Sequence, residues 1–325
     1  MKKPIALIVG ATGQDGTYLA KLLLENGYAV HGTSRDAELA SLRNMEAVGI
    51  RDKITLHSAS PVDFRSLLQA VQKVRPDEIY NLSGQSSVGL SFSQPAETIE
   101  SIATATLNLL EILRIAAPDV RFYNAGSSEC FGDTGGKAAN EETAFRPRSP
   151  YGVAKAAAVQ LVANYRESYG LFACSGLLFN HESPLRPARF VTRKITSTAA
   201  RIAQGSGERL KLGDLSIRRD WGWAPDAVRA MHLMLQQDTA RDYVIATGQA
   251  HSLEEFVVDA FATAGLDWRQ HVDFDPQQKR PSDIAHSLGD ASRAKSDFGW
   301  EPSVDFNGVI QRMMRAERDG PGSIA

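Results

Sequence analysis

The sequence predicts an α/β protein with a doubly wound parallel sheet of the Rossmann type, followed by a second, smaller mixed α/β substrate domain. Two observations carry this prediction. Short apolar runs rich in strand-forming residues alternate with helical patterns over the first half of the chain. The first of these runs stops at three glycines spaced three apart, Gly10, Gly13 and Gly16. The alternation implies parallel strands with right-handed crossovers, and the glycines imply that something lies close to the backbone.

The first unit is a strand, a glycine turn and a helix. The apolar run IALIVG (residues 5–10) precedes a helix that we expect over residues 14–26. In this position Gly10 permits a tight turn, Gly13 lets the backbone approach a pyrophosphate, and Gly16 allows close packing of helix on strand. A tight strand-to-helix turn alone would also explain such glycines. Their place after the first strand of an alternating chain favours a dinucleotide site at the helix N-terminus.

The later elements repeat this alternation. Strand-like runs follow at residues 29–34, 54–59, 78–83, 120–127 and 172–179. Helical stretches separate these runs, the clearest of them over residues 104–117 and 151–170. The run DYVIATG (residues 242–248) has strand character again, and we expect it to re-enter the main sheet.

The predicted division into domains follows from these elements. Residues 1–180 form a dinucleotide-binding Rossmann domain, with chain re-entry around residues 215–250. Residues 181–325 mainly form the second domain, which would bind the substrate. In open α/β sheets ligands bind beyond the carboxyl ends of the strands, so we expect the active site in the cleft between the two domains.

Composition limits the classes of protein that the chain can represent. With 325 residues, 43% hydrophobic and 23% charged, the mixture is that of a globular protein, and a net charge of −2 argues against binding nucleic acid. The N-terminal apolar stretch is too short for a secretory signal, and no segment approaches a membrane span. The two cysteines, Cys130 and Cys174, fit a reducing, cytoplasmic compartment. No His/Cys cluster suggests a metal.

The glycine spacing together with SPYGVAK (residues 149–155) resembles the extended short-chain dehydrogenase/reductase family, whose members modify sugar nucleotides. The resemblance implies that Tyr151 and Lys155 carry proton transfer. A spacing of four places both side chains on one face of a helix. A free phenol has a pKa of about 10, so Tyr151 needs a cation such as Lys155 to act as a base. Taken alone, the pair could be an ordinary exposed one on a helix.

An acid follows the fifth strand-like run. The stretch NAGSSECFG offers Ser127 at the position of the family's active-site hydroxyl, and Glu129 two residues later. A sugar 4,6-dehydratase must remove the C5 proton, which becomes acidic once C4 is a ketone, so it needs a carboxylate between sugar and cofactor. An isolated glutamate at a strand end would be a surface residue. Beside the Tyr/Lys pair, Glu129 is the predicted C5 base.

Longer stretches narrow the resemblance to the GDP-mannose 4,6-dehydratases. Similarity extends from about residue 5 to residue 300, and the stretches that carry it span residues 177–196, 212–228, 242–248 and 280–290. The resemblance implies a redox-neutral lyase that converts a GDP-mannose-type sugar nucleotide to its GDP-4-keto-6-deoxy product through a bound NADP. Its catalytic residues would be Ser127, Glu129, Tyr151 and Lys155.

The same resemblance implies two sets of binding residues. The cofactor set is Gly10, Thr12, Gly13, Gln14, Asp15, Gly16, Arg35, Leu82, Ser86, Tyr151, Lys155, His181 and Arg186. The set around the nucleotide sugar is Ser86, Asn180, Lys194, Arg219, Arg280 and Asp283. Guanidinium forks match phosphate oxygens, which favours the arginines as diphosphate ligands over their alternative as solvated surface residues.

The loop after the second strand departs from the family pattern. In GTSRDAEL, Arg35 stands where the family has two arginines, and Asp36 adds a negative charge next to it. Arg35 favours NADP, with NAD as the alternative. The resemblance also implies a homo-oligomer, either a dimer or a tetramer.

Two other functions stay open on the sequence. A GDP-sugar reductase or epimerase on the same scaffold is favoured by Ser127, which replaces the threonine of the dehydratases. A non-catalytic dinucleotide sensor is disfavoured, because all four candidate catalytic side chains are present. No residue distinguishes mannose from a manno-configured heptose.

Overall fold

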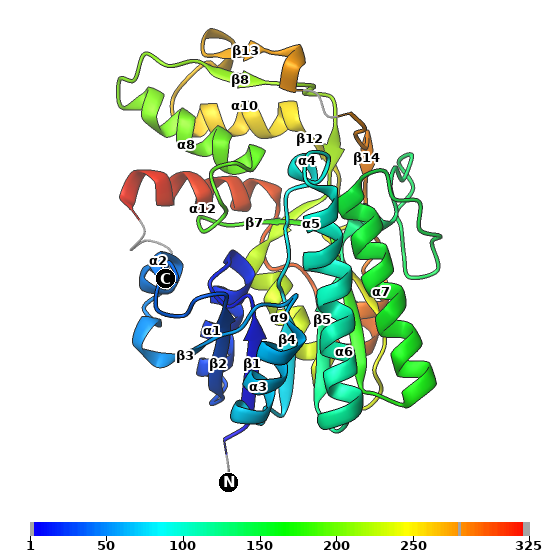
Figure 1. Cartoon of the computed structure of the whole chain (residues 1–325). Coiled ribbons are helices and arrows are strands. Elements are labelled where there is room, and N and C mark those ends of the chain that lie inside the picture. Colours follow the sequence, from blue (N-terminus) through cyan, green and yellow to red (C-terminus); the bar gives the residue numbers. More distant parts are fainter. Residues whose placement is uncertain (1–2, 279–280, 321–325) are drawn as a thin grey trace.

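The protein, a computed structural model that describes residues 3–278 and 281–320, has one large parallel sheet with a smaller lobe beyond the carboxyl ends of its strands (Figure 1). The seven strands lie in the order β11-β6-β5-β4-β1-β2-β3. Their bounds are Ile5–Val9 (β1), Ala29–Ser34 (β2), Thr55–Ser58 (β3), Glu78–Asn81 (β4), Arg121–Ala125 (β5), Ala173–Leu178 (β6) and Tyr243–Ile245 (β11). All neighbouring pairs are parallel, which confirms the doubly wound Rossmann sheet.

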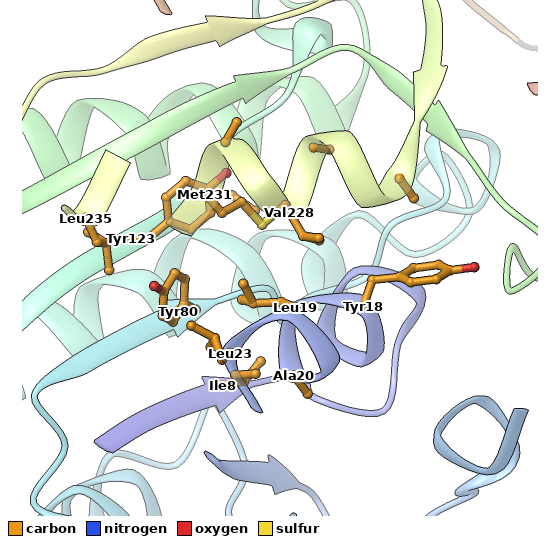
Figure 2. Packing of buried hydrophobic residues seen from close by; sticks show 14 of the residues in the cluster. Ile8, Tyr18, Leu19, Ala20, Leu23, Tyr80, Tyr123, Val228, Met231 and Leu235 are labelled. Atoms are coloured by element: carbon orange, nitrogen blue, oxygen red, sulfur yellow. The ribbon is translucent and has the colours of Figure 1, made fainter. Parts of the chain in front are cut away.

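Helices cover both faces of this sheet. On one face lie α1 (Gln14–Glu25) and α9 (Ala224–Leu235), and on the other lie α3 (Phe64–Val74), α6 (Ala105–Ala116) and α7 (Pro150–Tyr169). Residues of β1 alternate between the two faces, because successive side chains of a strand point to opposite sides. Ile8 packs with Leu19, Leu23 and Met231 between the sheet and α1 and α9 (Figure 2).

The smaller lobe is built around three helices. These are α8 (Val191–Ala203), α10 (Leu253–Thr263) and α12 (Phe306–Asp319), whose apolar faces form one core. Three small sheets surround that core: β7 (Asn180–Glu182) with β10 (Trp221–Trp223), β12 (His251–Ser252) with β9 (Arg218–Arg219) and β14 (His286–Ser287), and β8 (Leu210–Leu212) with β13 (Val272–Phe274). Parallel and antiparallel pairs both occur, so this lobe is mixed α/β as expected.

The remaining elements are short. They are α2 (Arg43–Ala47), α4 (Val88–Ser91), α5 (Pro95–Ile99), α11 (Ser292–Phe298), a π-helical segment (Glu100–Thr104) and 3₁₀ turns at Arg51–Lys53, Ser128–Cys130, Trp268–Gln270 and Pro276–Gln278. Across residues 3–278 and 281–320, no helix combines the length and the apolar character needed to cross a bilayer. Strand β11 pairs with β6, so the chain contributes to the main sheet again after it has entered the smaller lobe.

Candidate active site

The glycine turn between β1 and α1 has room for a ligand at one of its three glycines. Gly10 has a φ of +92°, and a Cβ on Gly16 would lie 2.4 Å from the carbonyl oxygen of Gly10. Both glycines are therefore required by the chain itself. A Cβ on Gly13 would meet only that same oxygen, at an ordinary 3.5 Å, and Gly13 is exposed at the N-terminus of α1. The turn fits a diphosphate, because the backbone amides at a helix N-terminus attract anions.

A charged pair joins this turn to the segment around β7. His181 Nε2 lies 2.9 Å from Asp15 Oδ2, and His181 Nδ1 lies 2.7 Å from the carbonyl oxygen of Phe179. Burial alone would raise the pKa of Asp15, but the charge and hydrogen bond of His181 lower it to about 2. Burial opposes the charged form of His181 too, yet the pKa of the imidazole is raised by Asp15. Each partner therefore favours the charged form of the other.

Gln14 strengthens the same junction. Its amide nitrogen donates to Asp15 Oδ1 (2.9 Å) and to the carbonyl oxygen of His181 (3.3 Å), and its amide oxygen accepts from Ser183 Oγ (2.8 Å). These bonds hold the start of α1 against the strand that leads into the smaller lobe.

Helix α7 presents the tyrosine and the lysine. Ser149 caps the helix by accepting a hydrogen bond from the Gly152 amide (3.0 Å), and Pro150 occupies its first turn. Tyr151 and Lys155 are 9% and 8% exposed, so they are not an ordinary surface pair. Lys155 Nζ donates to the carbonyl oxygen of Ala125 at the end of β5 (2.6 Å) and lies 5.9 Å from the centre of the Tyr151 ring.

Burial sets the protonation of both groups. It lowers the pKa of Lys155 to about 8 and raises the pKa of Tyr151 well above its usual value. The negative charge of Glu129 raises the pKa of Tyr151 further, whereas a hydrogen bond with Ser127 opposes this effect. The phenol is therefore protonated at neutral pH in this structure. It becomes a base only when a further positive charge lies close to it.

Glu129 lies on the same wall as the tyrosine. It follows the end of β5 in a 3₁₀ turn, where its amide donates to Ser127 Oγ (3.2 Å). Its carboxylate Oε2 accepts a long hydrogen bond of 3.5 Å from Ser149 Oγ, the cap of α7. Ser127, Glu129 and Tyr151 thus come from two elements that meet at the carboxyl end of β5.

The smaller lobe supplies the opposite wall. Arg219 lies on β9, its side chain is 7% exposed, and its guanidinium Nη2 lies 3.0 Å from Asp283 Oδ1. Lys194 on α8 donates from Nζ to the carbonyl oxygen of Lys211 (2.7 Å). Arg280 belongs to residues 279–280, which lie outside the described residues.

The two walls enclose a cleft of about 490 Å³. Most of the predicted site residues line it together: Asp15, Leu82, Ser86, Ser127, Glu129, Tyr151, Lys155, Asn180, His181, Arg186, Lys194, Arg219 and Asp283. The other predicted residues of the glycine turn and of the start of α1 are next to Asp15 in the chain, at one end of the cleft: Gly10, Thr12, Gly13, Gln14 and Gly16. Arg35 is exposed and directly follows β2. One cavity of this size suits an organic ligand rather than a single ion.

Arg189, Phe190 and Lys211 line the cleft but are not among the site residues predicted from the sequence, whereas the nearby Arg186 is. Arg186 and Arg189 both lie over the ring of Phe190, at 4.0 and 5.6 Å, and Arg186 Nε lies 3.2 Å from the buried Glu182. The two arginines and the phenylalanine of SPLRPARF are visible in the sequence, but an aromatic residue next to basic ones does not by itself indicate a site.

Two more such residues lie near the glycine turn. Asn44 Nδ2 donates to the carbonyl oxygen of Thr12 (3.0 Å), which brings the start of α2 against the turn. The neighbouring Arg43 is exposed there. Arg43 is therefore a second cation, besides Arg35, that follows β2 near this end of the site.

A tyrosine and a lysine four residues apart, buried at the carboxyl end of a Rossmann sheet beneath a second lobe, place the chain in the class of extended short-chain dehydrogenases/reductases. Comparison with known proteins refines this class. A family profile described as GDP-mannose 4,6 dehydratase matches residues 7–313. The chain belongs to this family.

Individual relatives agree with the family assignment. The chain is 45% identical over 322 residues to GDP-mannose 4,6 dehydratase 2 of Arabidopsis thaliana, which covers 96% of this chain and 86% of the relative. It is 41% identical over 344 residues to the human GDP-mannose 4,6 dehydratase, with 98% and 92% covered. Among solved structures, the UDP-glucose 4-epimerase of Thermus thermophilus in complex with NAD superposes with a TM-score of 0.86 at 24% identity, with 97% and 99% covered. This last likeness concerns the fold alone.

Proposed function

We propose that the protein is a hydro-lyase that converts GDP-mannose to its GDP-4-keto-6-deoxy product. The observation that carries this proposal is the position of Glu129. A carboxylate shares the cleft wall with Tyr151 and Ser127, so a second proton acceptor is available beside the one that acts at O4. A reductase, or an epimerase that acts at C4, needs no such base at C5.

We infer that a nicotinamide dinucleotide occupies the glycine-turn end of the cleft. Support comes from Gly13, where no protein atom requires a glycine, and from the amides at the start of α1. The bound cofactor supplies the oxidant for C4 and the reductant for C6, so the overall reaction is redox-neutral. Arg35 and Arg43, both exposed and cationic near this end, favour NADP over NAD.

Each catalytic side chain then has one task. Tyr151 takes the proton from O4 while C4 is oxidised, and the ammonium of Lys155 stabilises the phenolate that forms. Glu129 removes the C5 proton, which the neighbouring C4 ketone has made acidic. Ser127 donates a hydrogen bond to the leaving O6 hydroxyl, which departs as water with the proton that Glu129 took from C5. When C6 is reduced, C5 regains a proton from solvent through Glu129. A cleft that excludes bulk water would protect the unsaturated ketone until C6 is reduced.

The smaller lobe would hold the nucleotide. Arg219, already oriented by Asp283, and Lys194 present positive charge to a diphosphate, and Arg280 is a further candidate by the resemblance. A homo-oligomer, a dimer or a tetramer, is part of the same proposal.

The test is the Glu129→Gln variant, which keeps the size of the side chain and removes the base. Mixed with GDP-mannose and NADP, it should accumulate reduced cofactor and a 4-keto sugar that still has its 6-hydroxyl. Solvent deuterium should enter C5 in the wild type and hardly at all in the variant, as read by mass spectrometry.

The exposed Glu167→Gln on α7 is the matched control and should behave as the wild type. If Glu129→Gln forms the 4-keto-6-deoxy product at close to the wild-type rate, the role of Glu129 in elimination is wrong. Stoichiometric consumption of added reduced cofactor by the wild type would instead identify a reductase.

A further inference from the structure

A second groove, of about 630 Å³, lies against α12 in the smaller lobe. Among the described residues it shares no lining residue with the cleft. Its lining includes Thr247, Gln249 and His251, from the segment around β12, and Gln311, Arg312 and Arg315 of α12. A cavity of this volume is large enough for a nucleotide-sized ligand.

The α12 wall is cationic. Gln311, Arg312 and Arg315 follow Gly308 at spacings of three, four and seven residues, so they share one face of the helix. Among the described lining residues the acid is Asp305, whose Oδ1 already accepts the Gly308 amide at the helix N-terminus (2.8 Å). Both guanidiniums can therefore bind an anion in the groove.

The neighbours of the two arginines leave them available. Arg312 lies over the ring of Trp223, 5.6 Å from its centre, a contact that restrains the guanidinium without neutralising it. The pKa of Asp319 is lowered mainly by Arg318, which donates hydrogen bonds of 2.7 and 3.2 Å to its carboxylate, and to a smaller extent by the charge of Arg315. Asp319 therefore has Arg318 as its main partner.

The segment around β12 offers a flat ring, which packs on the first residue of α12. The imidazole of His251 stacks on Phe306 with centres 3.9 Å apart and planes inclined by 6°, and its Nδ1 lies 3.2 Å from Glu255 Oε2. Because Phe306 covers one face of the imidazole, the other face is the one that can receive a planar base. Guanidiniums that can bind phosphate and a ring that can stack on a base, in one groove, are what a nucleotide requires.

We propose that this groove is a second nucleotide site, which binds the phosphates of a nucleoside diphosphate at Arg312 and Arg315 and its base against His251. The proposal does not need the cleft to be a sugar-nucleotide site. The effect of this site on the cleft rests on the function proposed above.

The groove is bonded directly to the strand that carries Arg219. Thr247 donates to the buried carboxylate of Asp220 from both its amide (2.9 Å) and its hydroxyl (2.7 Å). His251 is the register partner of Arg219 in the antiparallel pair of β12 and β9. A ligand that contacts Thr247 and His251 therefore acts on the backbone that positions Arg219 in the cleft. Binding at the two places should be coupled, and equally so in both directions.

The first test measures GDP binding to the full chain by equilibrium dialysis. Arg312→Ala/Arg315→Ala should weaken binding of one GDP per chain at least about tenfold, because two charge-assisted contacts are lost. Arg219→Ala should leave that molecule bound. Arg318→Ala, on the same helix but outside the groove lining, is the matched control and should bind as the wild type.

A second variant, Arg312→Gln/Arg315→Gln, keeps the length of both side chains in case the alanine variant unfolds, and thermal unfolding checks both. A bound GDP that the groove variants lose and Arg219→Ala retains supports the groove, even if the cleft proves to bind no sugar nucleotide. Unchanged GDP binding in both folded groove variants overturns the proposal and leaves the cleft function untouched.

The second test concerns coupling. In the wild type, GDP should inhibit turnover of the sugar nucleotide with a mixed pattern, because it acts from the groove as well as in the cleft. In the groove variants, inhibition should become purely competitive, with the uninhibited rate unchanged. Purely competitive inhibition in the wild type would overturn the coupling.

Discussion

At the scale of single residues, burial decides which side chains of the cleft are charged. Tyr151 is protonated and Lys155 has a pKa of about 8, because both have lost most of their water. His181 shows the opposite outcome. Its two ring nitrogens both face acceptor oxygens, one of Phe179 and one of Asp15, so both must carry protons. The imidazolium is therefore part of the structure that holds β7 against α1.

We expect the stability of this His181–Asp15 pair to depend on pH from both sides. The folded pKa of Asp15 lies below its unfolded value, so its contribution is present above about pH 4 and is lost as pH falls toward 2. The folded pKa of His181 lies above its unfolded value of about 6.5, so its contribution is present below that pH and is lost as pH rises through the raised pKa.

Asp15→Asn should accordingly lower the free energy of unfolding by about 1–2 kcal/mol at pH 6, the size of a shift of one to two pKa units. The difference from the wild type should narrow as pH rises to 9, measured by urea unfolding. Asp52→Asn, at an exposed carboxylate in a 3₁₀ turn, should show no such trend. A difference that is constant from pH 6 to 9 would contradict the ionic pair.

At the scale of elements, the unit β1–turn–α1 divides two roles between its glycines. Gly16 is needed because α1 packs against the turn, and Gly10 is needed because its backbone lies in the left-handed region. Gly13 has an ordinary φ of −71° and no neighbour that excludes a Cβ. On the function proposed above, its lack of a side chain leaves room for the diphosphate of the dinucleotide at the turn.

The matched pair Gly13→Ala and Gly16→Ala separates these roles. Gly13→Ala should unfold at close to the wild-type temperature but bind the dinucleotide at least about tenfold more weakly, because the methyl group occupies the place of the phosphates. Gly16→Ala should lower the free energy of unfolding by about 2 kcal/mol or more, because the added carbon overlaps backbone. Thermal unfolding and cofactor titration check both. Unchanged cofactor affinity in Gly13→Ala would remove this turn from the site.

At the scale of the whole molecule, the smaller lobe lies beyond the carboxyl ends of the sheet strands (Figure 1). The two lobes have separate cores, and residues of both line the cleft. The Rossmann sheet carries the glycine turn and the proposed catalytic side chains, whereas the smaller lobe carries Arg219, Asp283 and Lys194. On the function proposed above, each lobe binds one of the two ligands, so their affinities can be changed separately.

Arg219→Ala tests this division. The variant should weaken binding of GDP-mannose at least about tenfold, because a buried guanidinium that contacts phosphate is lost and Asp283 is left with one partner fewer. Cofactor affinity should stay within about twofold of the wild type, as measured by fluorescence titration. Arg201→Ala is the control, because Arg201 lies in the last turn of α8 and forms an exposed ion pair with Glu208. A parallel loss of cofactor binding would contradict separate binding by the two lobes.

The sequence predicted most of the sheet because the signals involved are local. Six of the seven strands follow from apolar runs between helical patterns, and the seventh, β11, from a similar run after a long gap. Tyr151 and Lys155 could be paired from their spacing, since a helix places residues four apart on one face. The meeting of Ser127 and Glu129 with them was predicted from the resemblance to a family and from the carboxyl ends of parallel strands.

Other parts of the site depend on residues far apart in the chain. Asp15 and His181, and Arg219 and Asp283, are brought together only by tertiary packing, and no periodicity links such positions. The same holds for Asn44, whose side chain reaches the carbonyl oxygen of Thr12 and brings the start of α2, with Arg43, to the glycine turn. A sequence pattern describes neighbours along one element, whereas these contacts join different elements.

Local patterns in the chain were thus enough for the Rossmann sheet, the glycine turn and the Tyr/Lys pair, because hydrophobic period and residue spacing act within a strand or a helix. Folding in three dimensions settled which charges are paired, which groups are buried enough to change their pKa, and that a second groove lies behind Arg219. The physical reason is that desolvation and ion pairing depend on distances in space, and long-range packing of the two lobes sets those distances.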